Sequence, residues 1–245
     1  MKRKLISLLL CAAALFALGG TALAETQWDI PEEKDPSEYE YPVPEGLPVV
    51  DITSWEYRLA NQNNGIGPYC CPQVGFVYEQ GIDLRIYDNV IAMIEACRSE
   101  GLPCYINCGY RDYSFCFAQD QTALAYYYSS AAEMAANRLC TGCNEHQTGL
   151  GLDITDSFAY SANYDGQINE DAVYSETWAW MKEHCAEYGF IVRYPEGKEE
   201  YYGLACHPTH LRYVGTEAAQ YITENNLCLE EFLLLYGYPV KLPAD

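Results

Sequence analysis

The sequence is short of positive charge. Only 14 Lys and Arg residues stand against 35 Asp and Glu, which gives a formal net charge of −21. A protein that binds a nucleic-acid backbone needs a basic surface, and an anionic membrane surface repels an acidic protein. We therefore expect no nucleic-acid partner and no electrostatic binding to a membrane.

Long apolar runs are also scarce, and the one that stands out lies at the amino terminus. Residues 2–4 are basic, residues 5–18 are mostly apolar, and residues 22–24 read Ala-Leu-Ala. This order is typical of a secretory signal peptide with its cleavage site, and the run is shorter than the ~20 residues of a membrane span. We predict a signal peptide over residues 1–24, a secreted, extracellular protein and no membrane span.

The rest of the chain divides into two parts by composition. Residues 25–48 hold eight acidic residues, one lysine and five prolines, a composition that opposes regular structure and predicts an acidic, proline-rich tether. Residues 49–245 show the patterning of one globular domain, and no internal repeat is visible.

Hydrophobic periodicity predicts a mixture of helices and short strands in this domain. Helical spacing covers residues 86–100, 114–139, 175–188 and 216–226. Short strands are expected at 103–108, 149–155, 189–194 and 210–214. The uneven interleaving favours an α+β fold, a single domain with a small antiparallel sheet flanked by helices, over a doubly wound parallel sheet.

Cysteine is abundant, with 12 residues, of which only Cys11 lies in the predicted signal peptide. In a secreted protein this density predicts disulfides, and the odd number that remains leaves at least one thiol unpaired within the chain. Cys140 and Cys143 have the spacing of half a zinc ribbon, but no second such pair follows, so a disulfide is the better interpretation.

Histidine, in contrast, is rare and concentrated. Three of the four histidines lie in two short segments: His146 in a glycine-containing stretch that reaches Asp153, and His207 with His210 around a proline. Two imidazoles and one carboxylate form a three-ligand set that suits zinc and leaves a fourth position for water. We predict that His146, Asp153 and His210 bind one Zn²⁺ per chain.

These segments resemble a known family. His146 with Asp153, His210-Leu-Arg-Tyr-Val-Gly, the upstream Gly109-Tyr-Arg111 and the intervening Gly189-Phe-Ile-Val-Arg-Tyr-Pro resemble VanY-type D-alanyl-D-alanine carboxypeptidases of peptidase family M15, in consistent order over residues 55–236. The resemblance implies a zinc peptidase of the bacterial cell wall, with the small α+β fold shared by hedgehog signalling domains. It also implies that Arg111 grips the terminal carboxylate of the substrate, as a planar guanidinium can. Asp112, which follows it, is expected at the same substrate site.

The sequence departs from the family pattern at the expected general base. The family has Glu-Pro-Trp-His where this chain has His207-Pro-Thr-His210. His207 could accept the proton as a neutral imidazole, or it could fill the fourth zinc position and close the site. Glu145 is a weaker candidate for the base.

Together these features predict a secreted, cell-wall-associated zinc metallocarboxypeptidase that removes the C-terminal D-amino acid of peptidoglycan stem peptides. His207 and Arg111 would be its catalytic residues, and the protein is expected to be a monomer. The alternative is a catalytically silent, zinc-stabilised module that binds cell-wall peptides. Preference for DD or LD peptide ends, or for cross-links, stays open at this point.

Overall fold

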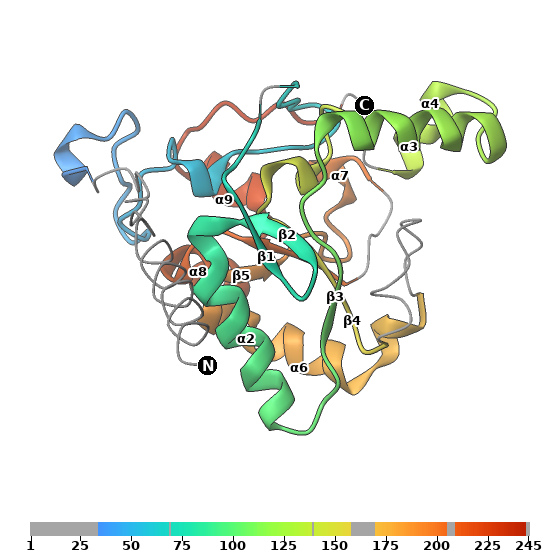
Figure 1. Cartoon of the computed structure of the whole chain (residues 1–245). Coiled ribbons are helices and arrows are strands. Elements are labelled where there is room, and N and C mark those ends of the chain that lie inside the picture. Colours follow the sequence, from blue (N-terminus) through green and yellow to red (C-terminus); the bar gives the residue numbers. More distant parts are fainter. Residues whose placement is uncertain (1–33, 69, 139, 158–169, 205–208, 244–245) are drawn as a thin grey trace, which may run out of the picture. The chain divides into compact units, whose positions relative to one another are not determined.

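The structure is a computed structural model, and it describes residues 34–68, 70–138, 140–157, 170–204 and 209–243 (Figure 1). Its strands are β1 (Val74–Val77), β2 (Gln80–Asp83), β3 (Tyr105–Cys108), β4 (Gly151–Thr155), β5 (Phe190–Val192) and β6 (His210–Tyr213). Its α-helices are α2 (Tyr87–Ser99), α3 (Tyr113–Tyr126), α4 (Ala131–Asn137), α6 (Glu176–His184), α7 (Glu199–Tyr202), α8 (Thr216–Glu224) and α9 (Leu229–Leu235). Short 3₁₀ turns join them, among them η4 (Glu145–Thr148) and η6 (Cys185–Tyr188).

The centre of the domain is a four-stranded antiparallel sheet in the order β3-β4-β6-β5. Apolar residues alternate along these strands, so that Ile106, Leu152, Ile154 and Leu211 face a core that α2 and α6 cover. A second core lies under α8 and α9 and includes Ile191 of β5. The predicted α+β class with a small antiparallel sheet flanked by helices is therefore confirmed.

The alternate residues of the central strands are polar and yet buried. Asp153 of β4, and His210 and Arg212 of β6, point away from the first core, and each is at most 5% exposed. Burying such groups costs free energy unless they are paired, so this face of the sheet must supply partners. The candidate site lies here.

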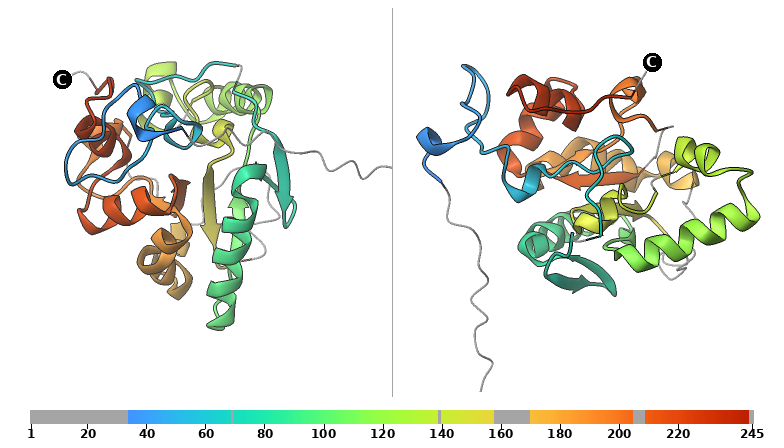
Figure 2. Two further views of the ribbon diagram at one scale, coloured as in Figure 1. Left: turned by 90° about the vertical axis from the view of Figure 1, so that its left-hand side faces the viewer. Right: turned by 90° about the horizontal axis from the view of Figure 1, so that it is seen from above.

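The long helix expected over residues 114–139 is two helices. The α3 helix ends at Tyr126, and Ser130 starts α4 by accepting a hydrogen bond from the Glu133 N–H at 3.1 Å. A serine is a strong N-cap, which explains the new start after the tyrosine run. The two helices lie on one side of the domain, apart from α8 and α9 (Figures 1 and 2).

Part of the segment predicted as a tether is folded against the domain. Within residues 34–48, Tyr41, Val43 and Leu47 pack against the core under α8 and α9, and the Tyr41 and Tyr238 rings are 5.5 Å apart. Apolar side chains between the prolines thus contact the domain, and the tether over residues 25–48 stays a prediction. The predicted signal peptide lies outside the described residues.

The predicted disulfides are not formed in the described part of the chain. Ten cysteines there carry free thiols. Several of them, such as Cys97, Cys104 and Cys185, are fully buried in the core that α2 and α6 cover, where a thiol packs as a small apolar group. Cys206 lies outside the described residues.

As for membrane insertion, none of the helices in the described ranges combines the length and the apolar character that crossing a bilayer requires.

Candidate metal centre

The loop before β4 brings His146 back onto Asp153. His146 lies in the η4 turn, and Gly149 ends that turn with a φ of +72°, a left-handed conformation that glycine adopts without strain. The chain then enters β4, where Asp153 is the third residue. As a result His146 Nε2 lies 3.2 Å from Asp153 Oδ2.

The sheet register brings the second histidine to the same carboxylate. Asp153 and His210 are direct partners across the antiparallel pair β4 and β6. Directly opposed residues point to the same face, and His210 Nδ1 lies 2.8 Å from Asp153 Oδ1. The two predicted histidine ligands therefore both contact the carboxylate of the third ligand, Asp153, and all three side chains are buried.

The charges in this cluster influence each other's protonation. Burial alone would raise the pKa of Asp153, but His146 and His210 outweigh it and hold the pKa well below its ordinary value. Burial lowers the pKa of His146. For His210, burial is outweighed by hydrogen bonds to Asp153 and Glu145, which raise its pKa. Asp153 is thus a carboxylate, the form in which it can bind a cation.

Glu145 is a partner of His210 rather than a free base. His210 Nε2 lies 3.2 Å from Glu145 Oε2, while Oε1 accepts hydrogen bonds from Arg193 Nε at 2.8 Å and from Arg212. Burial alone would raise the pKa of Glu145, but Arg193 and Arg212 outweigh it and lower the pKa. With both oxygens engaged, Glu145 orients the imidazole and leaves Nδ1 facing Asp153, as outer-shell carboxylates do for metal-binding histidines.

A buried network of charges extends from Glu145 into the protein. Arg193 donates two hydrogen bonds to Glu230 of α9, at 2.9 and 2.6 Å, and Asn61 donates to the same carboxylate at 2.8 Å. Arg212 also donates to the backbone carbonyls of Glu56 and Arg58. Both arginines and both glutamates are fully buried, so each positive charge has an adjacent negative one. Arg193 lies in the Gly189–Pro195 motif, but nothing in the spacing of Arg193 or Glu230 along the sequence indicates that their charges are buried.

The close packing around His210 depends on a glycine. A Cβ atom at Gly151 would lie 2.7 Å from His210 Nε2, closer than a side chain tolerates. The imidazole therefore lies directly over the backbone of β4.

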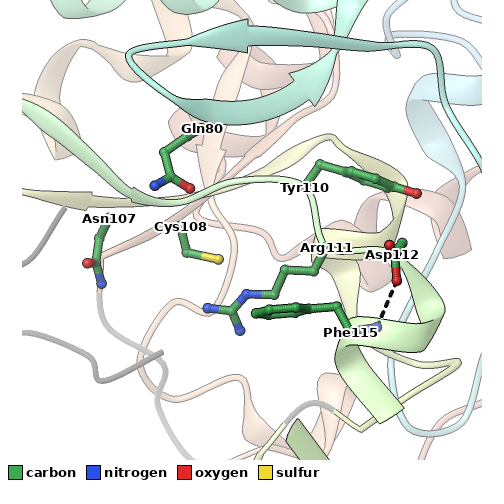
Figure 3. A pocket seen from close by; sticks show the side chains of 7 residues that line it. All are labelled: Gln80, Asn107, Cys108, Tyr110, Arg111, Asp112 and Phe115. Atoms are coloured by element: carbon green, nitrogen blue, oxygen red, sulfur yellow. Dashed lines mark hydrogen bonds between the residues drawn. The ribbon is translucent and has the colours of Figure 1, made fainter. Parts of the chain in front are cut away.

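A cavity of about 170 Å³ opens beside this cluster (Figure 3). Asn107 and Cys108 of β3, Tyr110, Arg111, Asp112 and Phe115 line it, together with Gln80 of β2. Figure 3 shows the Arg111 guanidinium and the Cys108 sulfur extending into the same space. Cys108, whose sulfur lies 3.6 Å from His146 Nδ1, and a cationic side chain thus line one pocket.

The backbone of Arg111 is hydrogen-bonded to the turn that carries the predicted metal ligand His146. Its N–H donates to the His146 carbonyl at 3.1 Å, and its guanidinium donates to Gln119 Oε1 at 3.2 Å. Asp112 lines the pocket and caps a helix, because its Oδ1 accepts from the Phe115 N–H at 2.7 Å (Figure 3), and its place at the substrate stays a prediction. His207 lies outside the described residues, so its role as base or fourth ligand stays a prediction.

The donors present fit zinc. One ligand atom each from Cys108, His146 and Asp153 lie within 4.8 Å of one another, and His210 adds a nitrogen on the other side of Asp153. Imidazole, carboxylate and thiolate are the ligand types that zinc takes in proteins. The ligand set of His146, Asp153 and His210 itself stays a prediction, although the structure places the three together.

The sequence matches the family described as VanY: D-alanyl-D-alanine carboxypeptidase over residues 79–216. The D-alanyl-D-alanine carboxypeptidase of Enterococcus faecalis (strain ATCC 700802 / V583) is 32% identical over 194 residues, which cover 75% of this chain and 67% of that protein. YodJ of Bacillus subtilis (strain 168) is 33% identical over 168 residues, 66% of this chain and 58% of YodJ. The chain therefore spans about three fifths to two thirds of the length of these relatives.

Solved structures agree with the sequence matches. A mutant of the vancomycin resistance D,D-pentapeptidase VanY from a VanB-type resistance cassette, in complex with Zn(II), superposes with a TM-score of 0.60 at 31% identity, covering 74% of this chain and 99% of that one. VanYB in complex with D-alanine-D-alanine gives a TM-score of 0.61 at 29% identity, covering 74% and 98%. The family match covers more than half of the sequence and includes every predicted ligand, so this chain belongs to the VanY family of D-alanyl-D-alanine carboxypeptidases.

Proposed function

We propose that this protein is a zinc-dependent D-alanyl-D-alanine carboxypeptidase that trims peptidoglycan stem peptides. The observation that carries the proposal is the backbone hydrogen bond from the Arg111 N–H to the His146 carbonyl, which ties the arginine to the turn that carries a predicted metal ligand. An enzyme that removes one terminal residue must recognise a free carboxylate at a set distance from the bond it cleaves. The guanidinium meets that need because it binds a carboxylate through two parallel hydrogen bonds.

The residues of the cluster divide this work. His146, Asp153 and His210 would hold the metal, and the contact of Glu145 with Nε2 orients the His210 ring so that Nδ1 faces Asp153. Zinc bound there would polarise the scissile carbonyl and activate a water molecule. Arg111 would hold the substrate carboxylate. Its hydrogen bond to Gln119 already restricts the side-chain rotamers before the substrate binds, so less conformational entropy is lost on binding.

Glu145 does not fit the part of general base. Its two oxygens already accept hydrogen bonds from Arg193, Arg212 and His210. His207 remains our candidate for the base. Similarity to relatives named as carboxypeptidases, and to a structure that holds D-alanine-D-alanine, supports an enzyme over the silent binding module.

We also propose that the protein acts outside the cytoplasm, at the cell wall, after removal of residues 1–24. This rests on the basic, apolar and small-residue order of that segment. Mass spectrometry of protein from culture medium and cell-wall fractions should find a mature chain that begins at Glu25.

The activity is tested with defined peptides. The zinc-loaded protein should release D-alanine from a stem pentapeptide that ends in D-Ala-D-Ala, more slowly from the tetrapeptide that ends in L-Lys-D-Ala, and not after treatment with a chelator. Asp153→Ala should abolish the release, whereas Asp88→Ala on the exposed side of α2 should not change it. A fully zinc-loaded protein that releases D-alanine from neither peptide would refute the proposal.

A further inference from the structure

A β-bulge in strand β3 places a sulfur atom in line with the predicted metal ligands. Ile106 pairs with Ile154, but the next pair along the strands is Cys108 with Asp153, so β3 has one more residue than β4 at this point. Without that extra residue, Asn107 would stand opposite Asp153. Bulges often re-aim a side chain next to an active site, and this one turns Cys108 to the polar face of the sheet.

The consequence is a row of three donor side chains across three strands. Cys108 of β3 is the partner of Asp153 on β4, and Asp153 is the partner of His210 on β6. Opposed residues share a face, so sulfur, carboxylate and imidazole stand side by side. His146 joins the row from the η4 turn, with Nδ1 at 3.6 Å from Cys108 Sγ.

The sulfur also borders the pocket. Cys108 is 4% exposed and lines the cavity that holds the Arg111 guanidinium (Figure 3). Because one donor atom each of Cys108, His146 and Asp153 lie within 4.8 Å of one another, a metal held among the three would have this thiol on its pocket side, where a substrate must approach.

We propose that Cys108 is a sulfur ligand of the metal, in addition to His146, Asp153 and His210. The inference rests on the proposed zinc site and deepens it. With Cys108 bound besides the three predicted ligands, four protein ligands would fill the tetrahedral shell that zinc prefers, so Cys108 would take the position that water needs. Cys108 would give up its thiol proton on binding, stabilise the bound metal and slow the reaction, because the sulfur would have to leave and regain a proton before the site is complete for hydrolysis.

X-ray absorption at the zinc edge tests this on the full-length protein loaded with one equivalent of zinc. The wild-type spectrum should contain one sulfur neighbour at about 2.3 Å besides nitrogen and oxygen neighbours at about 2.0–2.2 Å. Cys108→Ser should remove the sulfur neighbour. Cys116→Ser is the matched control, because Cys116 is also buried and hydrogen-bonds to the Arg111 carbonyl at 3.9 Å, and it should keep the sulfur neighbour.

Cobalt substitution gives a second readout. The cobalt-loaded wild type should show a sulfur-to-cobalt charge-transfer band in the near ultraviolet, and Cys108→Ala should lose it. Loss of an outer-shell partner of a metal ligand costs about 10- to 100-fold in affinity, so loss of a direct ligand should weaken zinc binding by at least about 100-fold. D-alanine release at saturating zinc should rise in Cys108→Ser.

Several results would overturn the inference. A fully loaded wild type with only nitrogen and oxygen neighbours would show that the sulfur is merely a hydrogen-bonding partner of His146, and a chain that binds no zinc would refute the ligand role outright. A sulfur neighbour that survives in Cys108→Ser would assign it to another cysteine. The wild-type spectrum decides even if a variant fails to fold.

The peptide assay separates this inference from the proposed function. D-alanine release without a sulfur neighbour leaves the carboxypeptidase and removes Cys108 from the metal. A sulfur neighbour without D-alanine release would keep Cys108 as a metal ligand and refute the carboxypeptidase activity.

Discussion

His210 Nε2 lies 3.2 Å from Glu145 Oε2, and both side chains are fully buried. Because Glu145 engages Nε2, the imidazole is oriented with its Nδ1 toward Asp153. Because Glu145 also neutralises Arg193 and Arg212, one carboxylate connects the predicted metal site to the charge network of the interior.

Replacing Glu145 should therefore damage both stability and metal binding. Glu145→Gln leaves the buried Arg212 guanidinium without its carboxylate partner, whereas Arg193 keeps Glu230, so the free energy of unfolding should fall by about 3 kcal/mol or more in urea titrations. Zinc affinity should fall by about 10- to 100-fold in competition with a chelator, since His210 loses its orienting partner. Glu183→Gln, exposed on α6, should change neither, and a Glu145→Gln variant with unaltered zinc affinity would contradict the orienting role.

Glu230 separates the two effects, because it contacts the network but not the ligands. Glu230→Gln weakens the paired hydrogen bonds from Arg193 and should lower the free energy of unfolding by about 3 kcal/mol. Its zinc affinity should stay within about threefold of wild type, well short of the effect of losing an orienting partner. Glu187→Gln is the control: it removes an exposed pair with His184 and should cost less than about 1 kcal/mol. Equal losses of unfolding free energy in Glu230→Gln and Glu187→Gln would argue against a stabilising role of the buried network.

Arg111 should determine the preference for a free carboxyl end. Arg111→Lys keeps the charge but loses the forked donor geometry, so kcat/KM for a peptide that ends in D-Ala-D-Ala should fall by about 10- to 100-fold, the equivalent of one charged hydrogen bond. Wild type should discriminate strongly against the same peptide with a C-terminal amide, and the variant should discriminate less. Arg138→Lys, which changes a partly exposed partner of Asp120, serves as the control. An unchanged ratio of the two substrates in Arg111→Lys would remove this arginine from carboxylate recognition.

The cysteines should differ widely in reactivity. Burial raises the pKa of Cys185 and of Cys228 to about 12, so at pH 8 only about one molecule in ten thousand carries a given thiolate. Cys71 is exposed. In native, reductant-treated protein, iodoacetamide followed by mass spectrometry should label Cys71 within minutes and leave Cys185 and Cys228 unlabelled until urea is added. Rapid labelling of Cys185 in the native protein would contradict its place in the core.

Much of the fold could be predicted from local patterns, because the hydrophobic periodicity of a helix or strand is visible within a short stretch of sequence. The predicted strand at 210–214 and the helix at 216–226 correspond to β6 and α8. Local patterns do not predict the hairpin of β1 and β2 or the helix α9, and they predict α3 and α4 as a single helix. The hairpin turn has no glycine at its centre, where Tyr78 and Glu79 take positive φ angles, so the usual turn signal is absent.

Short sequence motifs suffice to indicate the residue types of the site and their order: a His and an Asp separated by a glycine turn, a second His on a later strand, and an arginine upstream. This is possible because each motif is local. The bulge that brings Cys108 opposite Asp153, and the pairing of two buried arginines with Glu145, are seen only in the folded chain. Strand register and the pairing of charges distant along the chain depend on how the whole sheet packs, and no short stretch of sequence records them.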